Sequence, residues 1–115
     1  MADIESIARL QVVLAEALLA DDPVAFVRAL ALRPEADPAL LAIDADGLRI
    51  AALLVAKLRF QRLMNASRTA AEWFERDAAG FTVAFKRYHQ EVPPAALDPW
   101  GERDQFTDWC ARHGV

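Results

Sequence analysis

The sequence predicts an all-α fold: a compact single-domain bundle of five to six helices, with at most a small β element, spanning residues 1–115. Three observations predict it. Apolar residues recur at three- and four-residue steps, as they do on one face of a helix. Asp-Pro and Ser/Thr signals that start helices precede several of these segments, and Pro or Gly follows them. The one short run rich in β-branched and aromatic residues, at 82–85, fits a helix equally well.

Two helices and a connector are expected in the N-terminal part. The first helix covers residues 3–20 and turns one apolar face to the core, namely Ile4, Ile7, Leu10, Leu14 and Leu18. Asp22 is the predicted N-cap of the second helix, and Pro23 takes its first position, where the missing N–H costs nothing. This helix should end near residue 32. The connector holds Asp37-Pro38, which indicates a single helical turn.

A third helix is expected from residue 45 or 46 to Met64, and it is apolar on nearly all sides between residues 50 and 56. Such a helix is typical of the middle of a domain. Arg59 projects away from the main apolar stripe and is expected at the surface. We interpret two stripes as core: Ile50, Ala51, Leu54, Val55 and Leu58, and then Leu53, Phe60 and Met64 beside Lys57.

The C-terminal half predicts three more helices. Ser67 suits a helix start and residues 69–72 match a capping box, so a fourth helix begins there. Gly80 is expected to separate or bend the fourth and fifth helices, and Pro93-Pro94 to end the fifth. The last helix begins at Asp98-Pro99 and stops at Gly114. Phe106, Trp109 and Cys110 of the last helix are expected to face inward. Large apolar surface on the fourth and fifth helices comes from Trp73, Phe74, Phe81, Phe85 and Tyr88.

The composition is typical of a globular protein, with 55% apolar and 26% charged residues. The longest apolar stretch, residues 50–56, is far shorter than the roughly 20 residues of a membrane-spanning helix. Asp3 and Glu5 stand where a secretory signal carries lysine or arginine. We therefore expect a cytoplasmic protein that does not associate with a membrane.

Charge is unevenly distributed along the chain, whose net charge is -4. Residues 1–44 hold 3 basic and 8 acidic groups, residues 45–90 hold 8 and 4, and residues 91–115 hold 2 and 5. A positive middle attracts an anionic partner locally. The acidic ends oppose strong binding to nucleic acid.

The sequence contains no recognisable motif for catalysis or for a cofactor. His89 and Glu91 lack a second ligand pair at zinc-binding spacing, and the run from Asp44 has Val55 where a calcium loop needs glutamate. The four glycines form neither GxGxxG nor a P-loop. Cys110 is interpreted as a small buried hydrophobe rather than a nucleophile. We therefore expect no catalysis, metal or cofactor in this chain.

An arginine-and-aromatic strip is the candidate functional feature. Arginine recognises carboxylates in bidentate geometry, and aromatic side chains are enriched at protein interfaces. The alternatives are a solvated basic face over a buried aromatic core, a phosphate-binding surface for nucleic acid, and an interface between copies of this chain. The predicted partner- or peptide-binding residues are Arg59, Arg62, Arg68, Trp73, Arg76, Arg87 and Tyr88.

Residues 48–110 resemble a family of small bacterial helical proteins encoded beside multinuclear non-heme iron-dependent oxidases. The shared features are, in order, the basic helix LRIAALLVAKLRFQRLM, the Ser/Thr-capped helix SRTAAEWFERD, the aromatic helix FTVAFKRYHQEVPP and the terminal helix FTDWC. The resemblance covers slightly over half of the chain and lies in the order of these elements.

The resemblance implies a non-catalytic accessory subunit in the biosynthesis of ribosomally made peptide natural products. Such subunits form a heterodimer with a TIM-barrel oxidase, which carries the iron, and help to bind the leader of the precursor peptide. Relatives include the partner in methanobactin maturation. The partner of the enzyme that excises the β-carbon of a C-terminal cysteine in 3-thiaglutamate synthesis is most similar in size.

Some longer relatives are described as DNA-binding, so a small nucleic-acid-binding regulatory domain is the alternative function. The chain shows no three-stranded sheet of the leader-binding winged-helix kind. Strand addition and a helical groove therefore both stay open as ways to bind a leader.

Overall fold

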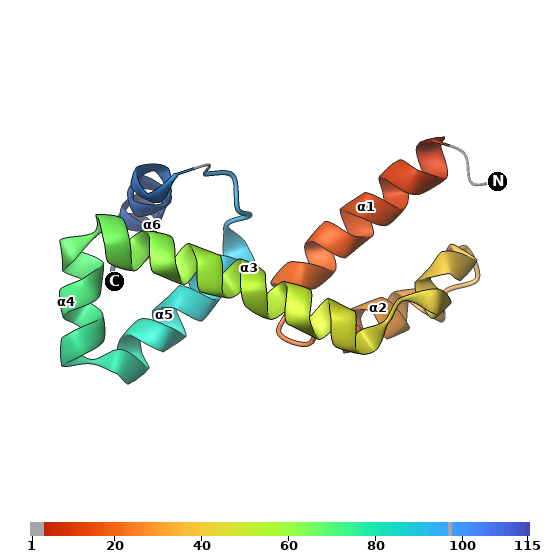
Figure 1. Cartoon of the computed structure of the whole chain (residues 1–115), viewed down its shortest axis with the longest axis horizontal. Helices are drawn as coiled ribbons and strands as arrows, with labels where there is room; N and C mark the ends of the chain where they lie inside the picture. The colour runs from red at the N-terminus through yellow and green to blue at the C-terminus, as the bar shows by residue number, and fades with distance from the viewer. Residues whose placement is uncertain (1–3, 97) are drawn as a thin grey trace. The chain divides into compact units, whose positions relative to one another are not determined.

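The computed structural model describes residues 4–96 and 98–115 and confirms the all-α class, because these residues form six α-helices and one short 3-10 helix and no strand. Figure 1 shows them in chain order. They are α1 (Ile4–Leu19), α2 (Pro23–Ala31), η1 (Pro38–Ala42), α3 (Ala45–Ala66), α4 (Arg68–Arg76), α5 (Ala78–Glu91) and α6 (Pro99–His113). Within the described ranges, no helix is both long and apolar enough to cross a membrane.

The chain divides into two compact units, and each is described by itself. Unit 1 comprises residues 1–55 and unit 2 comprises residues 56–115, so the boundary falls within α3. Each unit has its own cluster of buried apolar residues. The expectation that residues 1–115 form one domain stays a prediction.

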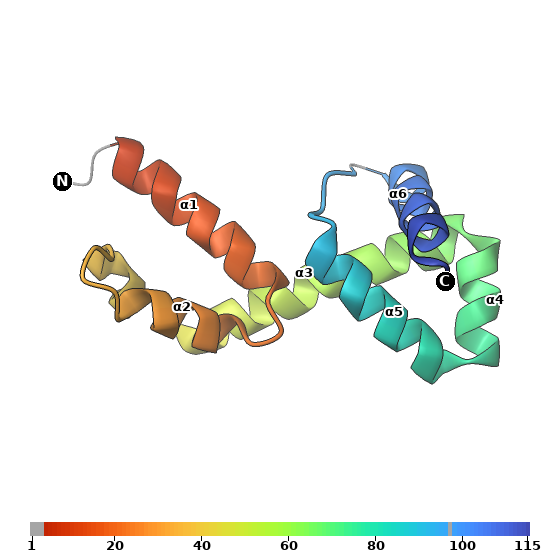
Figure 2. The ribbon, with the colours of Figure 1, turned by 180° about the vertical axis from the view of Figure 1, so that it is seen from behind.

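Unit 1 is built from α1, α2, η1 and the start of α3. The predicted N-cap of α2 is confirmed, since the Asp22 side chain accepts a hydrogen bond from the Ala25 N–H at 3.0 Å. Asp37 caps η1 in the same way through the Ala39 N–H. The aliphatic core consists of Ala17, Val24, Val27, Leu40 and Leu48. Figure 2 shows α1 and α2 converging near the turn that joins them and diverging toward their other ends.

The predicted apolar face of α1 is buried over only part of its length. Leu10, Leu14 and Leu18 pack against the aliphatic core. Ile4 and Ile7 do not, and their exposed fractions are 86% and 47%. The expectation that the whole face is core is wrong at these two residues, which lie in the first turns of α1 and outside the aliphatic core.

Helix α3 also has more exposed apolar surface than predicted. Its two stripes were both interpreted as core, but Ile50, Leu53, Leu54 and Leu58 are all exposed. Phe60 and Met64, near the C-terminal end, do pack against a buried cluster. The prediction failed because apolar composition says that a helix face favours burial, not that another element covers it.

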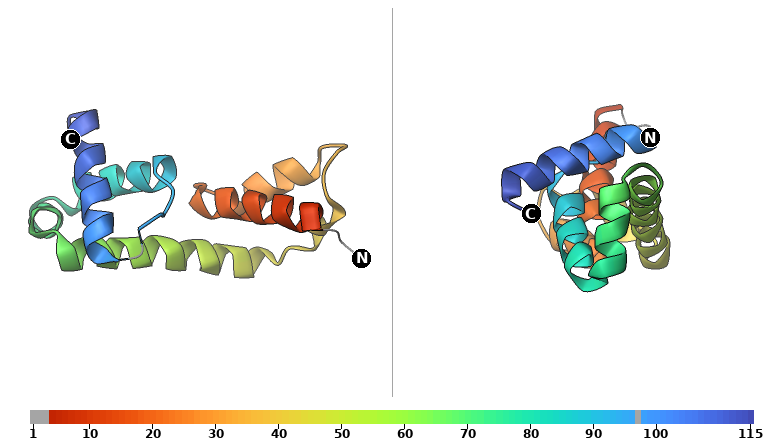
Figure 3. Two further views of the ribbon diagram at one scale, coloured as in Figure 1. Left: turned by 90° about the horizontal axis from the view of Figure 1, so that it is seen from above. Right: turned by 90° about the vertical axis from the view of Figure 1, so that its left-hand side faces the viewer.

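Unit 2 is built around an aromatic core formed by the end of α3 with α4, α5 and α6. The buried cluster is Leu63, Ala70, Phe81, Ala84, Phe85, Tyr88, Phe106 and Trp109. Many rings meet edge to face, as Phe60 and Phe74 do at 5.2 Å between centroids, which is the favoured geometry of aromatic pairs. Figure 3 shows α6 lying crosswise to α3 and α5. The predicted inward positions of Phe106 and Trp109 are confirmed.

Two predicted helix boundaries in unit 2 need correction. Helix α4 begins after Ser67, whose hydroxyl accepts from the Ala70 N–H at 3.1 Å, so the cap lies two residues before the capping box expected from Thr69. Gly80 does not separate α4 from α5. Asp77 does, because it ends α4 and caps α5 through the Gly80 N–H.

Helix α3 runs to Ala66, two residues beyond the predicted Met64, whereas three other predicted helix boundaries in unit 2 are confirmed. Helix α5 includes residues 82–85 and ends at Glu91, just before the paired prolines. Asp98 caps α6 through the Gly101 N–H at 2.7 Å. Gly114 ends α6 with a φ of 67°, a left-handed conformation that glycine adopts without steric cost.

Candidate functional site

The structure places two of the seven predicted binding residues inside unit 2. Arg59 is 1% exposed and Tyr88 is fully buried, so the expectation of a surface Arg59 is wrong. The reason is Glu102, a buried carboxylate 43 residues further along the chain, which provides the counter-ion that allows Arg59 to lie in the core. Neither side chain is accessible to a partner of the folded unit.

Arg59 and Glu102 form the centre of a buried polar network. The guanidinium binds the carboxylate in bidentate fashion, with Nε to Oε1 at 2.9 Å and Nη2 to Oε2 at 3.0 Å. Nη1 also donates to the Val92 carbonyl at 2.7 Å. The Tyr88 hydroxyl donates to Glu102 Oε2, and the guanidinium lies over the Tyr88 ring at 4.5 Å from its centroid. The network joins α3, α5 and α6 across the aromatic core.

His89 belongs to the same network and is neutral in it. Its Nδ1 lies 3.1 Å from Arg59 Nη1. Because a guanidinium only donates, Nδ1 must accept, and the ring proton is on Nε2. Burial lowers the pKa of His89, and the charge of Arg59 lowers it further, while Glu102 acts in the opposite direction. For Tyr88 burial acts in the other direction and raises the pKa of the hydroxyl group. The hydrogen bond to Glu102 raises it further.

Two more predicted residues are partly buried and occupied by contacts within unit 2. Arg62 Nη1 donates to the Ala96 carbonyl at 3.2 Å. Trp73 packs on the aromatic core, edge to face with Phe81 at 5.4 Å between ring centroids. Part of each side chain still reaches the surface.

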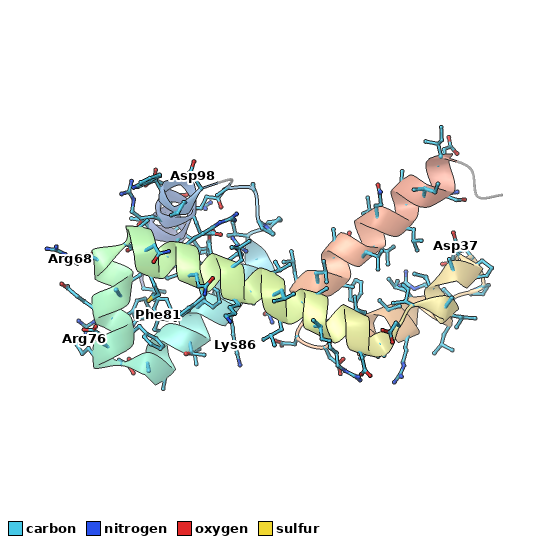
Figure 4. All side chains as sticks on the ribbon, in the orientation of Figure 1. Asp37, Arg68, Arg76, Phe81, Lys86 and Asp98 are labelled. Atoms are coloured by element: carbon cyan, nitrogen blue, oxygen red, sulfur yellow. The ribbon has the colours of Figure 1, made fainter. Side chains whose placement is uncertain are left out.

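The last three predicted residues are exposed arginines. Figure 4 shows Arg68 and Arg76 projecting from α4 on the side away from Phe81. Neither forms an ion pair with any described residue. Arg87 on α5 is 57% exposed, pairs with Glu91 at 2.8 Å and lies over the Trp109 ring at 5.7 Å from its centroid. The fully exposed members of the predicted site therefore lie on α4 and α5.

Cys110 and the buried polar network are the parts of unit 2 with side chains of potential reactivity. Burial raises the pKa of the Cys110 thiol, which disfavours the nucleophilic thiolate. The polar atoms of Arg59, Glu102 and Tyr88 are engaged with one another. Among the described residues, no three His, Cys, Asp or Glu side chains are grouped in a way that could hold a metal ion.

Sequence reasoning missed Glu102 completely. It lies in the first turn of α6, where an acidic residue is ordinarily explained by the helix dipole, and nothing local indicates that it is buried. A buried arginine requires a buried acid. Recognising Arg59 as a core residue would therefore have prompted a search for its partner.

Comparison with known proteins identifies no relative. No protein-family model, curated protein or solved structure matches the chain.

Proposed function

We propose that the protein is a non-catalytic accessory subunit that binds a multinuclear non-heme iron-dependent oxidase and helps to present that enzyme's precursor peptide. The observation that carries the proposal is the pair of exposed arginines on α4, Arg68 and Arg76, neither of which forms an ion pair with a described residue (Figure 4). The iron and the chemistry belong to the partner. Excision of the β-carbon from a C-terminal cysteine is the candidate reaction of the complex.

Two features of α4 favour a folded protein or a peptide over nucleic acid as the ligand. An unpaired guanidinium suits bidentate contact with a carboxylate. Glu72 and Glu75 are exposed on the same nine-residue helix, between the two arginines in sequence. The carboxylates of this helix repel a uniformly negative ligand such as nucleic acid. A protein or peptide can instead place acidic groups opposite the arginines and basic groups opposite the glutamates.

Replacing the arginines of α4 with glutamate tests whether the partner binds at this helix. The protein is co-expressed with the product of its neighbouring gene and the complex is isolated by size-exclusion chromatography, with iron measured in each peak. We expect a one-to-one complex that carries iron. Arg68→Glu and Arg76→Glu should each weaken it, by about 1.5–3 kcal/mol where the lost pair is desolvated.

Arg28→Glu is the matched control, because Arg28 is an exposed arginine on α2 in unit 1. It should leave the complex intact. A lone, metal-free peak from the wild-type chain would contradict the oxidase partnership. Equal binding by all three variants would contradict the use of α4. A gel shift with DNA that weakens steeply with salt would favour the regulatory alternative.

A further inference from the structure

Three large apolar side chains on α3 are exposed over more than half of their surface. The exposed fractions of Ile50, Leu53 and Leu54 are 59%, 69% and 59%. At roughly 100° per residue, Leu53 and Leu54 lie about 60° and about 40° to either side of Ile50, so the three share one side of the helix. The opposite side carries the buried residues of α3, which are Leu48, Arg59 and Leu63. The exposed apolar face therefore belongs to the helix itself, which is continuous in Figure 1.

One acidic and one basic residue flank this apolar face along the helix. Asp46 lies four residues before Ile50, Lys57 lies four residues after Leu53, and both are exposed. Both also lie within about 40° of Ile50 around the helix axis, so they are on the same side. Asp46 Oδ1 is 3.2 Å from Arg49 Nη1 of its own helix, but a pair this exposed contributes little. Lys57 forms no ion pair with any described residue.

The order of these residues is complementary to itself when it is reversed. Asp46, Ile50, Leu53 and Lys57 are spaced symmetrically about the point between Ile50 and Leu53. An antiparallel copy of the helix centred on that point places Ile50 opposite Leu53 and Asp46 opposite Lys57. A parallel copy would instead place each of the two charges opposite itself.

We propose that the chain forms a homodimer in which the exposed faces of two α3 helices pack against each other in antiparallel orientation. A two-fold interface contains every contact twice, so two Asp46–Lys57 pairs enclose a centre formed by Ile50, Leu53 and Leu54 of both copies. Removing these apolar side chains from water drives association. The charges determine direction and register, since like charges placed opposite each other are strongly unfavourable.

The symmetric spacing is the reason to assign this face to a second copy. Any apolar helix can cover the three exposed side chains, but a copy of α3 also supplies the matching acid and base at the matching offsets. The stripe from Asp46 to Lys57 spans eleven residues, or about 17 Å of helix at 1.5 Å per residue. A contact of this length is small for a protein interface, so we expect a weak dimer with a dissociation constant in the micromolar range. The proposal goes beyond the docking role proposed for α4 and uses neither arginine of that helix.

Sedimentation equilibrium of the full chain, at concentrations from about 1 µM to about 1 mM, measures this self-association. We expect monomer at the lowest concentration and dimer at the highest. Asp46→Lys and Lys57→Asp should each weaken association at least about tenfold, because each variant places like charges opposite each other at both ends of the pair.

An equimolar mixture of the two variants is the decisive measurement. In a mixed pair, the introduced lysine faces the introduced aspartate at one end, and the unchanged Asp46 and Lys57 face each other at the other end. Association of the mixture should therefore return to about the wild-type strength. Misfolding of either variant cannot produce such a recovery.

Glu16→Lys is the matched control, because it makes the same change of charge at an exposed acidic residue of α1. It should leave self-association unchanged. A wild-type chain that stays monomeric at the highest concentration would overturn the proposal. Self-association of wild-type strength in both single variants, or a mixture that associates no more than either variant alone, would also overturn it.

Discussion

The two units use their residues in contrasting ways. Unit 2 holds nine of the ten aromatic residues, packs most of them into one core cluster and also buries an ion pair, whereas unit 1 has one aromatic residue, Phe26, and an aliphatic core. Unit 1 holds 4 basic and 9 acidic groups, and unit 2 holds 9 and 8. Unit 2 therefore has a buried polar network, whereas unit 1 has large apolar side chains that are exposed. The distribution of charge along the sequence did not predict this difference between the units. Arg59, one of the arginines in the positive middle of the chain, is buried in the core.

The largest expected effect is the loss of the buried carboxylate. Glu102→Ala leaves the Arg59 guanidinium charged and unpaired in the core, which should lower the free energy of unfolding of unit 2 by about 3–5 kcal/mol. Urea unfolding followed by circular dichroism measures it. The double variant Arg59→Met/Glu102→Leu should recover most of this loss, because it removes both charges. A loss below about 1 kcal/mol in Glu102→Ala would contradict a core that depends on the pair.

A smaller effect compares two leucines of the same helix. Leu63 is fully buried in unit 2, and Leu53 is 69% exposed in unit 1, yet both lie on α3. Leu63→Ala should cost about 2–5 kcal/mol through lost burial and the cavity left behind. Leu53→Ala should change stability by no more than about 0.5 kcal/mol. Thermal unfolding of the two variants gives the difference, and equal costs would show that Leu53 is covered.

The smallest expected effect is a pH dependence from His89. Its pKa is lowered in the folded protein, so the unfolded chain binds the proton more readily. Stability should therefore be fully present above the ordinary pKa of 6.5 and fall as pH decreases toward the lowered folded value. Urea unfolding between pH of about 5 and 8 measures this slope.

His89→Asn should remove most of this slope, because the Asn amide oxygen can replace Nδ1 as the acceptor and does not titrate. His113→Asn is the control for the loss of a histidine elsewhere, and it should keep the slope. The opposite sign, with stability rising as pH falls from neutral, would contradict a neutral His89 paired with Arg59.

The sequence predicted what is determined locally. Asp22 and Asp98 were recognised as caps because each bonds an N–H three residues ahead, within the range of a sequence motif. For α4 the sequence offered two hydroxyls near the helix start, and the structure uses Ser67 rather than the capping box from Thr69. The fate of Arg59 depended on a residue 43 positions away, and the exposure of Ile4 and Ile7 on the course of another helix. Neither is encoded in a local pattern.

The buried pair also restricts how this sequence changes over evolutionary time. A single substitution at Arg59 or Glu102 leaves the other residue charged and unpaired in the core. The two residues should therefore be conserved together or replaced together. Distant homologues are therefore expected to co-vary at this arginine and this glutamate, 43 positions apart, with tyrosine and histidine adjacent to each other between them. That spaced quartet provides a search pattern for relatives that overall similarity does not reveal.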